Sequence, residues 1–259
     1  YVAGLVPSGA GAREMFEEPR NAYVLMGVEP EHDCLNPDVA VSALKGASLV
    51  VVMSAFKHAP AFDYADVMLP ITPYTETSGT FVNTEGRVQS FTGVVKPRGE
   101  ARPGWKVLRV LGNVLDLDGF SYESSEAVRD EVLGNDAEFV TGLDNGINGA
   151  VISLPTVTQG LQRVADVPIH FADPMARRSP ALQQTADAIA PKARMNAATL
   201  AQLGLAAGSL VRVKQGRGEA VLAVERDLGV PDGCVRVAAA HPTTSTLGEM
   251  FGLISVERA

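Results

Sequence analysis

Cysteine is scarce in this sequence, and so is positive charge. Two cysteines in 259 residues cannot supply the four thiolates that an iron–sulfur cluster usually needs, nor a disulfide framework. Lys and Arg number 22 against 30 Asp and Glu, for a net charge of -8, so the basic footprint of a nucleic-acid-binding protein is missing. The longest dense apolar run, Leu49–Met53, is far shorter than the ~18 residues that span a bilayer. Neither nucleic-acid binding nor a membrane span is expected.

The sequence also lacks an initiating methionine and a secretory leader. It opens on Tyr1, without the positively charged and long apolar segments of a signal peptide. We therefore expect a fragment of a longer protein, with a processed or trimmed N-terminus as the alternative. Hydrophobic residues make up 46% of the chain, which excludes a wholly disordered chain. The length fits one large domain or two smaller ones.

The first third of the chain alternates apolar strands with a helix. Residues 22–28, 48–53 and 66–70 are short apolar runs typical of buried strands. Between the first two runs, Asn36 and Pro37 predict the cap and first turn of a helix that ends near Gly46. Continuous apolar strands that alternate with helices are typical of a parallel α/β sheet.

The next stretch, residues 70–103, shows no helical or strand periodicity. It is rich in Thr, Ser, Gly and Pro and is too long for an ordinary connector, which is typical of a functional loop. Beyond it, an apolar stripe at spacings of three and four predicts a helix over 104–117. A cap at Ser124 or Ser125 predicts a second helix that ends at Leu133.

The C-terminal third has a different pattern. A helix is expected over 180–188, and a second, capped by Asn196, over 197–203. Val-rich strands are expected over residues 210–214, 220–225 and 234–239. Short strands separated by glycine-rich turns are typical of a small β-barrel or sandwich.

The irregular residues between these two patterns indicate a domain boundary. Clusters of Gly, Asn and Asp begin near Gly134 and continue toward Pro155, and such clusters are typical of loops. We therefore predict one domain over 1–135, an irregular linker over 136–168, and a second domain over 169–259.

Histidine and cysteine show no metal-binding spacing. The four histidines are His32, His58, His170 and His241. They are scattered along the sequence, so we expect surface or hydrogen-bonded core histidines and no metal site. Cys34 and Cys234 lie in different halves and are expected to be structural.

Two further tracts are weak signals. The glycines within 8–13 lack the third glycine of a dinucleotide-binding fingerprint and predict a flexible loop. Arg177 and Arg178 predict a solvated turn, with contact to an anion or an acidic partner as the alternative.

The tract Glu76–Arg87 is the strongest chemical feature. It places Glu, Thr, Ser, Asn and Arg among glycines, and such a tract presents backbone N–H groups and side-chain donors to a polar, phosphate-bearing ligand. The same side chains can instead hydrogen-bond the loop to itself, as in a structural Ω-like loop. The residues alone leave both interpretations open.

This tract and its surroundings resemble the molybdopterin oxidoreductase superfamily. The matching pattern is a Glu, a Gly-Thr, an Asn and a Glu-Gly-Arg within 76–87, then Gly-Glu-Ala-Arg at 99–102 before a helix that begins with a Trp. Runs over 64–67, 106–113 and 171–178 resemble one branch, the large iron–sulfur subunit of NADH-quinone oxidoreductase, which is respiratory complex I. The likeness extends over nearly the whole chain.

The resemblance implies a fold for each half. The first would be the end of a Rossmann-like, parallel-sheet α/β domain of the molybdopterin oxidoreductase kind. The second would be a molybdopterin-dinucleotide-binding domain, which in that superfamily is a double-psi β-barrel.

The resemblance also implies a part in electron transfer from NADH to quinone. The large iron–sulfur subunit carries its clusters in an upstream, N-terminal part, and the Cys-rich motifs for them are missing here. We therefore expect a cluster-free C-terminal part with a structural role in the respiratory chain and no cofactor of its own. The implied partners are the other subunits of the peripheral arm of complex I and the N-terminal domains of its own chain. The implied place is the cytoplasmic face of the inner membrane.

Eight residues match positions near the pterin in active members of the superfamily, as candidate or vestigial cofactor contacts. They are Glu76, Gly79, Thr80, Asn83, Glu85, Gly86, Arg87 and His241. No catalytic residue is predicted, and His241 is expected to be structural.

Two other functions remain in view. One is a cofactor-binding segment of an active molybdopterin oxidoreductase, such as a formate-dehydrogenase-like enzyme, and only this alternative predicts bound molybdopterin. The other is an independent β-barrel interaction module, which the long α/β half argues against.

Overall fold

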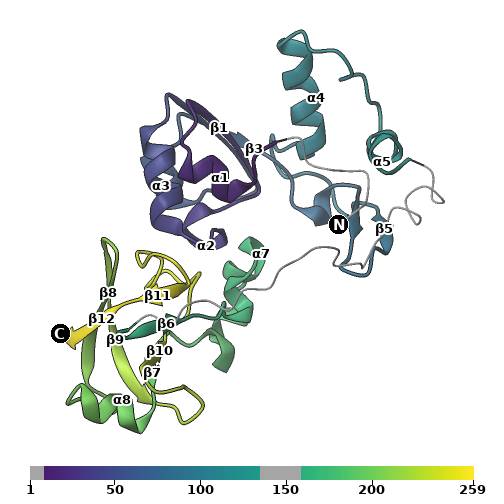
Figure 1. The fold of residues 1–259 in the computed structure, drawn as a ribbon. Helices are drawn as coiled ribbons and strands as arrows, with labels where there is room; N and C mark the ends of the chain where they lie inside the picture. Colours follow the sequence, from purple (N-terminus) through teal and green to yellow (C-terminus); the bar gives the residue numbers. More distant parts are fainter. Residues whose placement is uncertain (1–8, 135–158) are drawn as a thin grey trace, which may run out of the picture.

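The computed structural model describes residues 9–134 and 159–259. We call residues 9–134 the α/β part and residues 159–259 the barrel part; Figure 1 draws them in purple to teal and in green to yellow. Most of the linker predicted over 136–168 lies outside the described residues. Within that range, β6 (Gln162–Val164) pairs with strands of the barrel part. The predicted boundary stays a prediction.

A three-stranded parallel sheet is the centre of the α/β part. Its three strands fall on the predicted apolar runs and lie in the order β1-β2-β3. The elements are α1 (Ala12–Glu17), β1 (Ala22–Met26), α2 (Pro30–Asp33), α3 (Pro37–Gly46), β2 (Leu49–Ser54), the 3₁₀ turn η1 (Ala59–Asp63) and β3 (Val67–Pro70). The register places Tyr23 opposite Val50 and Val52 opposite Met68.

Helix α3 forms where its cap predicted it. The Asn36 side chain accepts a hydrogen bond from the Val39 backbone N–H at 3.3 Å, and Pro37 occupies the first turn. Ala43 and Leu44 then pack on the sheet within the buried core of the α/β part. Burying a leucine of this kind contributes about 1.5–3 kcal/mol.

The sheet is covered by helices on one face. Helices α1 and α3 lie together on the same side of it in Figure 1, and Phe16 of α1 packs against this core. On the other face, Val24 and Val67 are exposed. Parallel sheets are ordinarily covered on both faces.

Residues 70–103 are more regular than the sequence predicted. They contain the 3₁₀ turn η2 (Tyr74–Glu76) and a two-stranded hairpin of β4 (Gly79–Val82) and β5 (Val88–Phe91). The alternation that marks a strand is weak because both hairpin strands are largely exposed.

Two helices complete the α/β part. Helix α4 (Gly104–Val114) ends earlier than predicted, because Asp116 adopts a positive φ of 55° and Leu117 turns back to the Gly112 carbonyl. Helix α5 (Ser125–Leu133) is capped as predicted: the Ser124 side chain accepts from the Ala127 N–H at 3.1 Å.

The barrel part is built on a curled seven-stranded sheet, with strands in the order β11-β6-β10-β7-β9-β8-β12. Besides β6, its elements are the 3₁₀ turns η3 (Ile169–Phe171), η4 (Leu182–Gln184) and η5 (Ala186–Ala188), α7 (Pro174–Arg177), β7 (Ala193–Met195), α8 (Ala197–Gln202), β8 (Leu210–Gln215), β9 (Gly218–Arg226), β10 (Cys234–Arg236), β11 (Phe251–Leu253) and β12 (Ser255–Arg258). The predicted fold class, a parallel-sheet α/β segment followed by a small barrel-like β domain, is confirmed.

The helix predicted over 180–188 is wrong. Two 3₁₀ turns stand there instead, η4 and η5, separated by Thr185 in an extended conformation with ψ 164°. The Thr185 hydroxyl donates to the Leu182 carbonyl at 2.7 Å. A side chain that competes for backbone groups in this way disfavours a continuous helix.

The barrel core is mainly apolar, and one charged side chain, Arg163, is buried in it. Val211, Val213 and Val235 have no exposed surface, and Arg163 of β6 is only 1% exposed among them. Its guanidinium donates to the Gln215 side-chain oxygen and to the Glu249 carbonyl, each at 3.0 Å. The remaining acceptors are the carbonyls of Val237, Ala238 and Gly248. No carboxylate pairs with Arg163 among the described residues, and burial lowers its pKa to about 10.

Across residues 9–134 and 159–259, no helix combines the length and the apolar character that a membrane crossing requires.

Candidate functional site

Buried charges gather at the carboxyl edge of the parallel sheet. Strand β1 ends at Met26 and β2 ends at Ser54, and the segments that follow carry Glu29 and His58. In open α/β sheets, ligands bind at this edge. Glu29 is 3% exposed and His58 is 7% exposed, so both side chains are held inside the protein.

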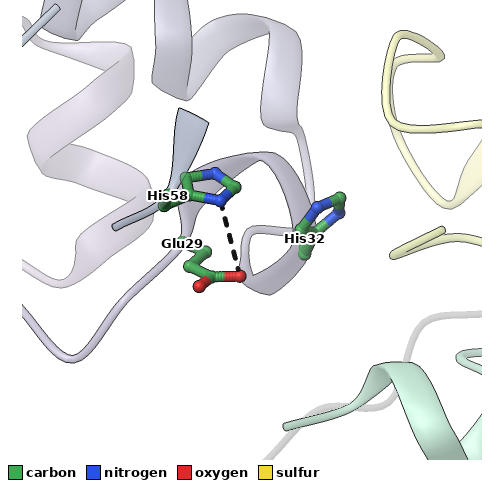
Figure 2. Close-up of side chains that lie close together, drawn as sticks. All are labelled: Glu29, His32 and His58. Atoms are coloured by element: carbon green, nitrogen blue, oxygen red, sulfur yellow. Dashed lines mark ion pairs between the residues drawn. The ribbon is translucent and has the colours of Figure 1, made fainter. Parts of the chain in front are cut away.

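A second imidazole, from His32 in α2, joins them. One nitrogen of each histidine and a carboxylate oxygen of Glu29 lie within 4.8 Å of one another. Figure 2 shows the Glu29 carboxylate next to the His58 ring, with the His32 ring beside both. His58 Nδ1 lies 3.7 Å from Glu29 Oε2, and the ring centroids of His32 and His58 are 5.7 Å apart.

His32 and His58 thus lie close together in the fold, and His58 is a hydrogen-bonded core histidine, as expected. The expected absence of a metal site stays a prediction. The two histidines are far apart in sequence, but they follow two adjacent parallel strands, which end at the same edge of the sheet. That topological fact is the signal available in the sequence: the apolar runs predict both strands, and the segments after them contain His32, His58 and Glu29.

Glu31 orients the His58 ring from the other side. His58 Nε2 and Glu31 Oε2 are 2.8 Å apart, and the Tyr64 hydroxyl donates to the same oxygen at 3.5 Å. Burial raises the pKa of Glu31, but the hydrogen bond from His58, a backbone hydrogen bond, the charge of His58 and the hydrogen bond from Tyr64 together outweigh burial, so the pKa lies below its ordinary value. Burial, followed by the Glu31 charge, raises the pKa of Tyr64. Glu31 is therefore an anion that accepts from both neighbours.

Two arginines of the barrel part enter the same cluster, so the solvated turn predicted for them is wrong. Arg177 Nη1 donates to Glu29 Oε2 at 2.9 Å, and Arg177 Nη2 pairs with Asp33. Arg178 Nη2 lies 2.6 Å from Glu29 Oε1, and its guanidinium lies over the Phe56 ring, 4.6 Å from the centroid. The alternative, contact with an acidic partner, is met inside the chain.

Local sequence explains why Arg177 is held in place. Asp173 caps the short helix α7 by accepting from the N–H groups of Met175 and Ala176. The Arg177 Nε then donates to the Phe171 carbonyl at 2.7 Å. The Arg177 side chain is consequently 7% exposed, which makes this a buried contact between the two parts.

The electrostatics of the cluster fix its protonation. Burial raises the pKa of Glu29, but the hydrogen bonds from Arg178 and Arg177 and the charge of His58 outweigh burial and lower it overall. Burial, followed by repulsion from Arg177, lowers the pKa of His32 to about 4. At neutral pH, His32 is therefore a neutral imidazole, and its buried Nδ1 has no hydrogen-bond partner among the described residues.

The predicted tract Glu76–Arg87 forms the hairpin, and its turn is held by its own groups. The Asn83 side-chain oxygen accepts from the N–H groups of Glu85 and Arg87 at 3.0 and 2.9 Å. Gly86 adopts a positive φ of 78°, which the turn needs. The Arg87 side chain is exposed at the tip.

Other predicted residues of this tract contact the second hairpin strand or the loop that follows it. Thr80 on β4 is 3.0 Å from the Ser90 hydroxyl on β5. Glu76 accepts from the Arg98 N–H at 3.0 Å and so ties the hairpin to the following loop. Gly79 faces the Phe91 ring, which would meet an added Cβ at 3.0 Å. These contacts hold the loop in shape, and contact with a cofactor stays a prediction.

His241 lies in the barrel part. It is buried, and its ring packs on Phe171 with centroids 4.4 Å apart. The Thr243 N–H donates to His241 Nδ1 at 3.1 Å, and the Thr243 hydroxyl lies 2.9 Å from it. Burial lowers the pKa of His241. Within the described residues, its ring and hydrogen-bond partners come from the barrel part rather than from residues 76–87.

The barrel part also has a charged pocket of about 510 Å³. Its cations are Lys192, Arg194 and Arg236, and three carboxylates also line it, those of Asp166, Asp187 and Glu225. Lys192 pairs with Glu225 at 2.5 Å and Arg236 with Asp166 at 2.8 Å, and these paired side chains are about half exposed. The pocket thus has accessible positive groups at its surface.

Comparison with known proteins finds one family match in each part of the chain. The molybdopterin oxidoreductase family matches residues 4–114, and the molydopterin dinucleotide binding domain matches residues 170–250. Among curated proteins, one named "Putative formate dehydrogenase" from Staphylococcus aureus (strain bovine RF122 / ET3-1) is 35% identical over 97 residues. One with the same description from Staphylococcus haemolyticus is 33% identical over 99 residues.

The aligned regions are short relative to these proteins. Each covers 38% of this chain and 10% of the relative. Among solved structures, acetylene hydratase from Pelobacter acetylenicus matches with a TM-score of 0.62 and 16% identity, covering 95% of this chain and 46% of that one. At that identity, the likeness shows a shared fold.

The two matched domains follow one another on a single chain, and the fold of both parts agrees with them. Residues 4–114 are thus similar to the molybdopterin oxidoreductase family, and residues 170–250 are similar to the molydopterin dinucleotide binding domain.

Proposed function

We propose that this chain is the cofactor-side segment of a molybdopterin-dependent redox enzyme of the formate dehydrogenase kind. The observation that carries the proposal is the dinucleotide binding domain at residues 170–250, which follows the oxidoreductase match on the same chain. The names of the staphylococcal relatives support the choice of reaction. The aligned regions cover a tenth of those relatives, so the whole protein's activity belongs to the proposal.

The charged pocket of the barrel part fits an anionic dinucleotide in size and in donor type. Ligand pockets commonly measure about 300–1,000 Å³, and this one is about 510 Å³. Arg194 and Arg236 can exchange their exposed carboxylate partners for phosphate oxygens, because exposed ion pairs are weak and arginine binds phosphate in a bidentate manner. Lys192 adds a third cation. When bound, the molybdopterin cofactor would supply a molybdenum ion that exchanges electron pairs with the substrate.

A second candidate is the structural role in the large iron–sulfur subunit of NADH-quinone oxidoreductase. The observation that favours it is that several polar groups already have partners within the protein. Asn83 accepts hydrogen bonds from the backbone of the hairpin turn, and Arg177 and Arg178 pair with Glu29. Polar groups that already have protein partners stabilise a scaffold without a cofactor. In this role the partners are the N-terminal domains of the same chain and the other subunits of the peripheral arm, at the cytoplasmic face of the inner membrane.

Metal and pterin content separate the two candidates. We expect the parent protein, purified from its own host, to carry about one molybdenum per chain and to release a fluorescent pterin after oxidation. Absence of both, together with NADH–quinone activity in the assembled complex, overturns the first candidate and supports the second.

Variants then test whether the charged pocket of the barrel part binds the dinucleotide. Arg194→Ala with Arg236→Ala removes two cations of the pocket and is expected to lower pterin content. Arg212→Ala is the matched control, because Arg212 is a half-exposed arginine on β8 that pairs with Glu219 and Glu257, outside the pocket. Equal pterin content in the unmodified protein and both variants contradicts the assignment of the pocket.

A further inference from the structure

We propose that Glu29, His32 and His58 form a binding site for a first-row divalent transition metal ion, with Zn²⁺ as the ion of best fit. The site lies at the carboxyl edge of the parallel sheet, against the barrel part. It is separate from the charged pocket proposed for the dinucleotide, and it does not rest on the proposed function.

The first argument for a metal site is the set of ligand atoms that lie close together. Two imidazole nitrogens and a carboxylate oxygen lie within 4.8 Å of one another. Two His and one Glu with an open fourth position are a ligand set used for Zn²⁺. Tetrahedral ligands at about 2.1 Å from the ion stand roughly 3.4 Å apart, so side-chain movements of about 1 Å close the site.

The surroundings of His58 match those of a metal ligand. Metal-binding histidines usually donate their other ring N–H to a carboxylate, which fixes the tautomer. Here His58 Nε2 is 2.8 Å from Glu31 Oε2, which leaves Nδ1 as the lone-pair nitrogen toward Glu29 Oε2, 3.7 Å away. Glu31 would thus be the outer partner that orients the ligand.

His32 supplies a second, independent observation. Its buried Nδ1 has no hydrogen-bond partner among the described residues. A buried polar atom without a partner is costly, and coordination to a metal ion would satisfy it.

The charges around the cluster are compatible with a bound cation, and Arg177 is the group that would compete with it for Glu29. Arg177 pairs with Glu29 and Asp33, Arg178 pairs with Glu29, and Glu31 lies against His58. Three carboxylates thus stand against two guanidiniums in the cluster. Arg177 and the metal ion would share Glu29 Oε2, while Arg178 holds Oε1. Metal binding would therefore loosen one contact between the two parts, and Arg177 would keep Asp33 and the Phe171 carbonyl.

Titration of the metal-free full chain with Zn²⁺, and separately with Co²⁺, tests the site. We expect one Zn²⁺ per chain by calorimetry, a Co²⁺ visible spectrum typical of low coordination number, and a rise in Tm with Zn²⁺ concentration, since a ligand that binds only the native state stabilises it. His32→Gln is expected to weaken binding at least tenfold and to abolish the Zn²⁺-dependent rise in Tm.

His170→Gln is the matched control, because His170 in η3 lies outside the cluster, and it should bind as the unmodified chain does. Arg177→Gln is a second variant and should bind Zn²⁺ more tightly, because the competitor for Glu29 is removed. Zn²⁺ affinity unchanged by His32→Gln, lost equally in His170→Gln, or weaker than about 100 μM in the unmodified chain overturns the proposal. These readouts do not involve molybdenum or pterin, so their outcome is independent of the proposed function.

Discussion

Arg177 of the barrel part donates to Glu29 of the α/β part at 2.9 Å, and neither side chain has more than 7% of its surface exposed. A second contact between the parts, from Arg217 to Asp38 at 3.2 Å, lies at the surface with Arg217 74% exposed. An arginine–carboxylate ion pair thus joins the two parts once in the interior and once at the surface.

The buried pair should contribute far more to stability. Arg177→Met leaves the Glu29 and Asp33 carboxylates with less compensation, and breaking a buried ion pair costs about 3–5 kcal/mol. We expect a loss of about 3 kcal/mol in urea unfolding, because Arg178 still holds Glu29. Arg217→Ala is the control and should cost under about 1 kcal/mol. Equal losses in the two variants would contradict the buried contact.

Arg163 should be indispensable to the barrel. Arg163→Met leaves a buried Gln215 oxygen and backbone carbonyls without donors, at about 1–3 kcal/mol for each group left unsatisfied. We expect a loss of at least about 3 kcal/mol in chemical denaturation. Arg163→Lys should not restore stability, because an ammonium lacks the planar fork of donors. A stable Arg163→Met variant would refute this interpretation of the core.

Gly218 at the start of β9 should not tolerate a side chain. An added Cβ would lie 1.6 Å from the Thr246 carbonyl oxygen, and backbone cannot yield as a flexible side chain can. We expect Gly218→Ala to lower the free energy of unfolding by about 1–3 kcal/mol, as overpacking does. At Gly248 the nearest atom to an added Cβ is 3.8 Å away, so Gly248→Ala should be nearly neutral in thermal unfolding.

Acidic pH should lower the stability of the barrel part, because Asp166 becomes protonated. The hydrogen bond from Arg236 holds the pKa of Asp166 below its ordinary value. Because the folded-state pKa is the lower one, the stabilisation is complete above the unfolded pKa of about 3.9 and is lost as the pH falls through the folded value. Asp166→Asn should flatten the fall in Tm over this acidic range and leave its pH dependence near neutrality unchanged. A steeper fall of Tm with decreasing pH in Asp166→Asn would contradict this direction of the pH dependence.

Stability and cofactor roles of the hairpin can be separated at its turn. Asn83→Ala removes the acceptor of two backbone N–H groups and should cost about 1 kcal/mol. Arg87→Ala removes an exposed side chain and should leave the unfolding curve in place. If Arg87→Ala lowers the pterin content of the parent protein without altering stability, the residue is a cofactor contact rather than a vestige.

Elements with strong local signals were predictable. Asn36 and Ser124 fixed the starts of α3 and α5 because a cap satisfies N–H groups of the first turn wherever the helix sits. The apolar runs predicted β1, β2 and β3, since strands of a parallel sheet are buried in the interior of the fold. The hairpin at 79–91 was missed because its strands are exposed and carry no apolar alternation.

The cluster at Glu29 was not predictable from spacing. His32 and His58 form no local motif and meet only because β1 and β2 are adjacent and parallel. The role of Arg177 depends on docking of the barrel part, which no residue pattern near Arg177 encodes. The eight residues predicted from the family resemblance are placed by the structure, yet their relation to a cofactor stays a prediction.

The acceptors of Arg163 come late in the chain. Its guanidinium binds the carbonyls of Val237 and Glu249, 74 and 86 positions further on. On a ribosome, β6 therefore emerges long before its charge can be satisfied, and the barrel can close only after the loop before β11 has been made. Folds dominated by such distant contacts form slowly, and their unfinished states expose apolar surface. Nascent-chain folding of this protein should thus depend on chaperones during the synthesis of its last quarter.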